Sequence, residues 1–151
     1  MAFLQGIYEV KNKNKYLGPK NPRYMSSYEL QTFQFLDYHP EILKWGSEII
    51  IIDYFSPVDL GPGGKMGKMR RYMVDLYVEY IKNGELSKEL IEIKPLKDLK
   101  IPKKTGRKKK ETYLREVYTY NVNKAKWAAA KKYAEARGWK FKFLTENQIF
   151  G

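Results

Sequence analysis

The sequence predicts one α/β domain in which a small mixed sheet is flanked by helices. Two observations carry this prediction. The spacing of apolar residues changes along the chain from helical to strand-like and back to helical. The chain has 151 residues, 43% of them hydrophobic, which suits one substantial core and is too short for two. We therefore expect a single domain over 1–151, with an irregular arm at 1–24 and a core at 25–151 that contains a basic loop at 97–111.

The first helix is expected to follow Ser26. The pattern Ser26-x-x-Glu29 has the form of a capping box, an apolar stripe follows it, and Pro40 marks the end of the helix. The β-branched run at 48–54 is typical of a buried strand, and the glycine-rich stretch at 57–67 predicts a loop.

Two strands that look like neighbours come next. Residues 72–81 alternate between two faces, and Asn83-Gly84 is a turn signal. Residues 90–94 form the second strand, which Pro95 ends. We expect the two strands to pair as a hairpin.

The C-terminal part predicts a helix and a last strand. The alanine-rich segment at 122–137 favours a helix, and Gly138 suits the position after its end. Residues 140–145 form the final strand. The expected order is helix, three strands, helix, strand.

The charge of the chain indicates a polyanionic partner. Lys and Arg number 29 against 17 Asp and Glu, a net charge of +12, and residues 97–142 carry all of this excess. Nucleic acid is the first candidate, and a solvated loop is the alternative. The candidate phosphate contacts are Lys103, Lys104, Arg107, Lys108, Lys109 and Lys110 in the loop, and Lys65, Lys68, Arg70 and Arg71 in a second basic stretch.

The composition also excludes several classes of protein. The chain has no cysteine, so it has neither disulfides nor a thiolate zinc site, and its single histidine argues against a His-rich metal site. No stretch approaches the ~20 apolar residues of a membrane span, and the N-terminus lacks the layout of a signal peptide. We expect a soluble, intracellular protein without a membrane partner.

Asp75 and the triplet Glu92-Ile93-Lys94 carry the chemical signal. Alternate residues of a strand share a face, so Glu92 and Lys94 point the same way, and hairpin pairing brings Asp75 beside them. Two neighbouring carboxylates repel each other, and a divalent cation resolves this conflict, with the Ile93 carbonyl as a further ligand. A water on the metal would then attack a phosphodiester, and Lys94 would orient it or stabilise charge on the phosphate. A surface salt bridge explains the same spacing equally well.

Glu29 also has two interpretations. It closes the capping box with Ser26, and this alone would explain it. It also lies on the apolar stripe with Phe33 and Leu36, where a carboxylate needs a partner, and a metal site under the helix would supply one. Glu48 is a further carboxylate that could approach the site.

These residues resemble a known family. Asp75 followed by Glu92-x-Lys94 looks like the core of the PD-(D/E)xK nuclease superfamily. The wider pattern is similar to the head completion nucleases of T-even-like tailed phages, which are related to the N-terminal domain of the transposon-end endonuclease TnsA. The resemblance spans about Lys15 to Phe150. The motifs that carry it are Lys15-Tyr16-Leu17-Gly18, Tyr24-Met25-Ser26-Ser27-Tyr28-Glu29, Leu36-Asp37, Ile42-Leu43-Lys44-Trp45-Gly46-Ser47-Glu48, Arg71-Tyr72-Met73-Val74-Asp75, Ile91-Glu92-Ile93-Lys94-Pro95, Asn123-Lys124-Ala125-Lys126-Trp127 and Phe143-Leu144-Thr145-Glu146.

The resemblance implies a restriction-endonuclease-like core and a role for each matching residue. It gives Glu29 as the helix carboxylate, Asp75 and Glu92 as ligands of Mg²⁺ or Mn²⁺, and Lys94 as the catalytic lysine. Lys126 matches a lysine on the helix after the core, where it would touch DNA phosphate or support the site. The one departure is valine at the position before Asp75, where the family usually has proline.

The function that the resemblance implies is Mg²⁺-dependent hydrolysis of phosphodiester bonds in double-stranded DNA during head completion, after DNA packaging. Its partners would be phage head or portal proteins and a second copy of the chain, and its place would be the host cytoplasm and the virion. Two alternatives stay open at this point. One is a non-catalytic DNA-binding head completion protein that keeps the nuclease fold, and the other is a TnsA-like transposon-end endonuclease.

Overall fold

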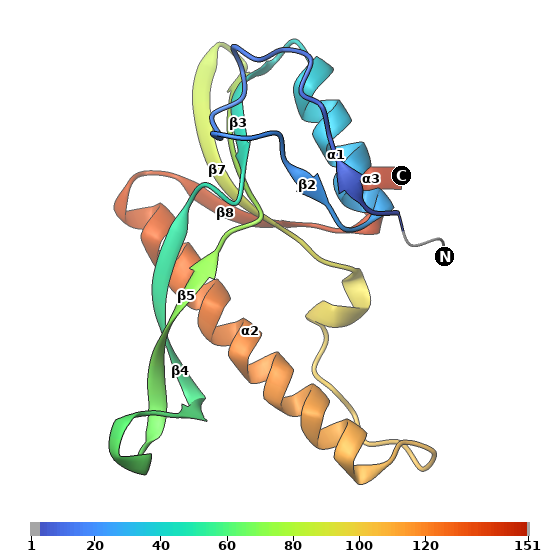
Figure 1. Cartoon of the computed structure of the whole chain (residues 1–151), viewed down its shortest axis with the longest axis vertical. Helices are drawn as coiled ribbons and strands as arrows, with labels where there is room; N and C mark the ends of the chain where they lie inside the picture. Colours follow the sequence, from blue (N-terminus) through green and yellow to red (C-terminus); the bar gives the residue numbers. More distant parts are fainter. Residues whose placement is uncertain (1–3, 151) are drawn as a thin grey trace.

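A four-stranded mixed sheet forms the centre of the computed structural model, which describes residues 4–150 (Figure 1). Its strands lie in the order β3-β6-β7-β8. β6 is antiparallel to both β3 and β7, and β8 is parallel to β7. The α/β class with a mixed sheet is therefore confirmed. The bounds are Ile42–Ser47 for β3, Leu76–Lys82 for β6, Glu85–Ile93 for β7 and Lys140–Leu144 for β8.

The hairpin of β6 and β7 forms as the sequence predicts. Its turn residues Asn83 and Gly84 have φ of 52° and 78°, the left-handed pair that a tight two-residue turn requires. The register pairs Leu76 with Ile91 and Tyr77 with Leu90. This hairpin brings the beginning of β6 to the end of β7, where the candidate site lies.

One helix covers each face of the sheet. α1, Ser27–Tyr38, packs Phe33 and Leu36 on the face that carries Leu76, Val78 and Ile91. α2, Lys110–Ala136, packs its small residues on the other face, which carries Leu90. Because β6 and β7 are buried on both faces, the alternate residues of each strand belong to two different cores. A short helix, α3 at Glu146–Phe150, follows β8.

A two-stranded ribbon leaves the sheet and runs along α2 (Figure 1). It consists of β4, Ile51–Leu60, and β5, Met66–Met73. The inner face, with Ile52, Tyr54 and Tyr72, packs against α2. A 3₁₀ turn at Pro62–Gly64 forms the tip. The predicted loop at 57–67 is thus shorter than expected, because both strands of the ribbon extend into it.

Several further expectations are corrected by the structure. The sequence does not predict β3, and the strand expected at 48–54 begins only at Ile51 and lies in the ribbon. The strand expected at 72–81 is interrupted at Val74 and Asp75, where the chain passes from the ribbon into the sheet. α2 starts twelve residues before the predicted 122, because its first turns project beyond the sheet and need no apolar stripe. The basic loop is correspondingly shorter, since 3₁₀ turn η2 occupies Leu96–Leu99.

The N-terminal segment belongs to the core, although most of it lacks regular structure. Its strands β1, Gly6–Ile7, and β2, Arg23–Tyr24, pair with each other, and Tyr8 and Val10 are buried beside Phe33. Asp37, fully buried in α1, accepts hydrogen bonds from the Tyr8 hydroxyl at 2.6 Å and from the backbone N–H groups of Lys11 and Asn12 at 2.8 and 2.9 Å. Burial acts to raise the pKa of Asp37, but these donors outweigh it and the pKa lies below its usual value. This carboxylate ties the segment to α1.

Across residues 4–150, no helix is both long and apolar enough to cross a membrane.

Candidate active site

Asp75 and Glu92 form a buried pair of carboxyl groups. The hairpin register places Asp75 beside the end of β7, and Asp75 Oδ2 accepts a hydrogen bond of 2.8 Å from the Ile93 N–H. Glu92 is only 6% exposed. Burial, and then the neighbouring charge of Glu92, raise the pKa of Asp75 to about 8. Below about pH 8 the pair therefore keeps one proton, and a bound cation would take the place of that proton.

Tyr72 joins the ribbon to this pair. Its hydroxyl donates a hydrogen bond of 2.8 Å to Glu92 Oε1, and burial followed by the charge of Glu92 raises its pKa far above the usual value. Lys126 Nζ of α2 lies 5.6 Å from the centre of the Tyr72 ring, within cation–π range. Lys126 thus stands next to the site. The sequence marked Lys126 through the family resemblance, but it offered no reason to single out Tyr72.

Glu29 forms the predicted cap of α1 and also acts electrostatically on Asp75. Its N–H donates to Ser26 Oγ at 3.2 Å, and its Oε1 accepts from the Met25 N–H at 3.1 Å, so the capping box is formed with its return bond one residue before the N-cap. Burial raises the pKa of Glu29, and the charge of Glu48 adds to the rise. The charge of Glu29 in turn raises the pKa of Asp75. The N-terminus of α1 therefore brings a third carboxylate close enough to Asp75 to act on it electrostatically.

Glu48 lies at the turn between β3 and the ribbon. Its φ is 57°, a left-handed conformation that is uncommon for a residue other than glycine, and its N–H donates to the Asp75 carbonyl at 3.1 Å. This bond fixes the backbone of Asp75 at the point where the ribbon enters the sheet. Backbone strain next to a buried acid is a feature that active sites often show.

Lys94 borders a basic hollow. It follows the last residue of β7 and lines a hollow of about 510 Å³ between the segment after β7 and α2. The cationic residues of this lining are Lys94, Lys97, Lys100, Lys108 and Arg115, against the acidic Asp98 and Glu116. The excess of cations suits an anionic group such as a phosphate.

The carboxyl pair has the donor chemistry of a magnesium site. Within residues 4–150, no cluster of three or more His, Cys, Asp or Glu side chains is placed to hold a metal ion. Mg²⁺ does not need one, because it is usually held by one or two carboxylates and keeps several waters. Two hard oxygen donors in a buried pair, Asp75 and Glu92, therefore fit this cation.

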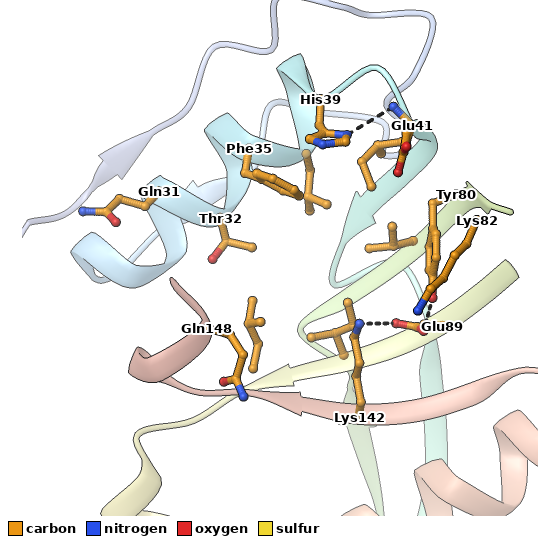
Figure 2. A pocket seen from close by; sticks show the side chains of 15 residues that line it. Gln31, Thr32, Phe35, His39, Glu41, Tyr80, Lys82, Glu89, Lys142 and Gln148 are labelled. Carbon is orange, nitrogen blue, oxygen red and sulfur yellow. Dashed lines mark hydrogen bonds and ion pairs between the residues drawn. The ribbon is translucent and has the colours of Figure 1, made fainter. Parts of the chain in front are cut away.

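A second buried glutamate on β7 shows the contrast. Glu89 points to the α1 side, into a hollow of about 420 Å³ lined by residues such as Phe35 and Leu144 (Figure 2). Lys142 Nζ lies 2.7 Å from Glu89 Oε1, and the Tyr80 hydroxyl donates to Oε2 at 2.5 Å. The Glu89 charge is thus balanced within the protein, whereas a tyrosine and a second acid surround Glu92.

The predicted DNA contacts lie mostly at the end of the molecule away from the sheet. The ribbon tip and the basic loop lie there on either side of α2 (Figure 1). Two of the loop lysines are engaged in contacts within the protein. Lys104 Nζ donates to the Lys108 carbonyl at 2.6 Å, and Lys108 Nζ contacts Glu116 Oε1 of α2 at 2.6 Å. Arg70 is paired with Asp59 at 2.9 Å. The remaining predicted contacts are all exposed and are Lys65, Lys68, Arg71, Lys103, Arg107, Lys109 and Lys110.

Comparison with known proteins places this chain in a family. The sequence model described as "TnsA-like endonuclease N terminal" matches residues 39–146, a range that contains Asp75, Glu92 and Lys94. The chain belongs to the TnsA-like endonuclease N-terminal family. It is also 40% identical over 153 residues to the head completion nuclease of Enterobacteria phage T4, covering 99% of this chain and 95% of that protein. No solved structure matches it. The resemblance found in the sequence motifs is confirmed, and with it the restriction-endonuclease-like class of the fold.

Proposed function

We propose that this protein is a metal-dependent endonuclease that hydrolyses phosphodiester bonds of double-stranded DNA during completion of a phage head. The observation that carries the proposal is the buried carboxyl pair Asp75 and Glu92, in which burial and the charge of Glu92 raise the pKa of Asp75, in a chain of an endonuclease family. The name of the T4 relative supports the role in the head. Phage head or portal proteins would then be partners, and the protein would act in the infected host cytoplasm and in the virion.

Each residue of the site has a part in this proposal. Asp75 and Glu92 hold Mg²⁺ or Mn²⁺, with the Ile93 carbonyl as a further ligand. A bound Mg²⁺ supplies Lewis acidity and makes a water nucleophilic at neutral pH. Lys94 orients the attacking water or stabilises charge that develops on the phosphate. Glu29 adds negative charge that strengthens cation binding, and Lys126 supports the site beside Tyr72.

The basic surfaces would hold the DNA. Lys65 and Lys68 at the ribbon, together with the exposed cations of the loop, supply phosphate contacts that carry no sequence information. The hollow lined by Lys94 and by Lys108 of the loop would hold a phosphate of the DNA backbone. The charge excess and the carboxylates thus have separate tasks, binding and cutting.

A cleavage assay tests the proposal. Supercoiled plasmid is incubated with the purified protein in Mg²⁺, in Mn²⁺ and in EDTA. We expect nicked and linear products with either metal and none in EDTA. Glu92→Gln should lose at least about a thousandfold in rate while DNA binding persists, and Glu85→Gln, an exposed carboxylate on the same strand, should cut normally.

Two results would overturn this assignment. Metal-dependent cleavage that survives both Asp75→Asn and Glu92→Gln would place the chemistry elsewhere. A wild-type protein that binds DNA without cutting it, and an Asp75→Asn variant that still completes phage heads in vivo, would make this a DNA-binding protein with a nuclease fold.

A further inference from the structure

The outer face of the β4–β5 ribbon carries a group of exposed apolar side chains. Strand alternation turns Ile52, Tyr54 and Tyr72 inward onto α2, so their neighbours in sequence face outward. The outward apolar residues are Ile51, Phe55, Met69 and Met73, with 44%, 55%, 60% and 51% of their surfaces exposed. Several exposed apolar side chains gathered on one face mark an interaction site more often than single ones do.

The register arranges this face in three rows across the two strands. Ile51 lies opposite Met73 and Phe55 lies opposite Met69. The row between them holds Asp53 opposite Arg71, and both are exposed. The face therefore reads apolar, charged, apolar, with the negative charge on one strand and the positive charge on the other.

We propose that the occupant of this face is a second copy of the same chain, packed ribbon against ribbon about a two-fold axis parallel to the strands. With such an axis, each row of one copy lies over the same row of the other copy, and β4 of one copy lies over β5 of the other. Asp53 of each copy then faces Arg71 of the other, and Ile51 and Phe55 face Met73 and Met69 of the other. One rotation satisfies both charges and both apolar rows, as an isologous interface requires.

The charged row selects this axis over its alternative. A two-fold axis running across the strands would place Asp53 against Asp53 and Arg71 against Arg71, which costs free energy in an interface. Packed sheets keep their strands within about 30° of each other, so the rows stay in contact in the favoured arrangement. A face whose charges complement themselves fits a copy of itself better than an unrelated surface.

The position and size of the face set the expected behaviour of the dimer. Met73 stands two residues before Asp75, so each copy would hold its carboxyl pair next to the interface. The face is small beside the ~800 Å² per partner of a standard interface, so we expect a dissociation constant in the micromolar range. The proposal concerns association alone and does not depend on the chain being a nuclease.

Sedimentation velocity on the full chain without DNA tests the proposal through exchanged charges. We expect the wild type to pass from monomer to dimer between about 1 and 200 µM. Asp53→Arg places two arginines against two arginines, and Arg71→Asp places two aspartates against two aspartates, so each variant should weaken dimerisation at least about tenfold. An equal mixture of the two variants should restore the dimer, because every arginine in the charged row of one variant then faces an aspartate of the other.

The restoration is the decisive arm, since a variant that merely unfolds cannot be rescued by another. Thermal unfolding of each variant checks that the single substitutions leave the fold intact. A wild type that stays monomeric at about 200 µM, or two variants that dimerise as well alone as together, would overturn the proposal. Binding of another protein to a monomeric wild type through Phe55 would assign the face to that partner instead.

Discussion

The hydroxyl of Tyr72 donates a hydrogen bond of 2.8 Å to Glu92 Oε1 and so links the ribbon to the central sheet at the candidate site. Tyr72 is 4% exposed and packs in the same core as α2. Through this bond, the placement of the ribbon fixes the orientation of a carboxylate that we assign to the metal. Tyr72 is thus a positioning residue, because it acts on the reaction through Glu92.

Removal of this hydroxyl should weaken metal binding. In Tyr72→Phe the ring stays packed while Glu92 loses its donor, and loss of such a supporting bond typically costs about 10- to 100-fold in metal affinity. We expect the Mn²⁺ concentration for half-maximal binding, measured by calorimetry, to rise about tenfold. Tyr80→Phe removes a similar bond to Glu89 on the opposite face and serves as the matched control, with unchanged Mn²⁺ binding.

Neutralising Asp75 should stabilise the metal-free protein at high pH. The raised pKa of Asp75 means that, between about pH 4 and pH 8, the folded state keeps a proton that the unfolded state has lost. The stability of the wild type therefore falls as the pH rises through this window. Asp75→Asn removes the dependence, and we expect it to exceed the wild type at about pH 8 by on the order of a few kcal/mol.

Urea unfolding at about pH 5 and pH 8 in EDTA measures this difference, and Mg²⁺ should cancel it by stabilising the wild type alone. Glu85→Gln, which changes an exposed carboxylate, should follow the wild type at both pH values. An Asp75→Asn variant that is less stable than the wild type at the higher pH would show that the folded state does not disfavour the ionised form of Asp75.

Loss of the buried carboxylate of Asp37 should free the N-terminal segment. Asp37→Ala leaves the donors on Tyr8, Lys11 and Asn12 without an acceptor, and we expect a loss of about 3 kcal/mol or more. Because the folded pKa of Asp37 is depressed, its contribution is present above the usual value of about 3.9 and disappears as the pH falls through the folded pKa. Limited proteolysis and denaturant unfolding at neutral pH and at about pH 3 check both points.

The exposed cations of the loop should contribute more to DNA binding than the cations that are paired within the protein. Lys103, Arg107 and Lys109 are exposed, whereas Lys108 is paired with Glu116. Each neutralised phosphate contributes about 0.9 to the slope of log K against log salt, so the triple alanine variant should lower that slope by up to about 2.7. Lys108→Ala should change the slope little, and fluorescence anisotropy with a duplex at several salt concentrations measures both.

Local signals in the sequence predict the part of the fold that carries the carboxyl pair. The capping box at Ser26 and Glu29, the turn at Asn83-Gly84 and the alternation of β7 depend on neighbouring residues, and the structure contains all three. They suffice to place Asp75 beside Glu92. Of the two interpretations of Glu29, the structure contains the cap, and the role in a metal site stays a prediction, because local sequence does not show how close α1 lies to Asp75.

The parts that the sequence could not predict depend on distant contacts. β3 pairs only with β6 among the named strands, and its Trp45 is buried by the N-terminal segment and α1 rather than by an alternating pattern. Ile51 and Ile52 read as a central strand, but the left-handed turn at Glu48 directs them into the ribbon. The role of Tyr72 follows from the position of that ribbon, so no local sequence pattern predicts it.

A crystal soaked in Mn²⁺ tests the central claim most directly, because anomalous scattering locates the cation without an activity assay. The account predicts one anomalous peak within bonding distance of a carboxylate oxygen of Asp75 and one of Glu92, and no peak there in an Asp75→Asn crystal. A wild-type crystal with Mn²⁺ bound elsewhere, and with no peak at these two carboxyl groups, would contradict it.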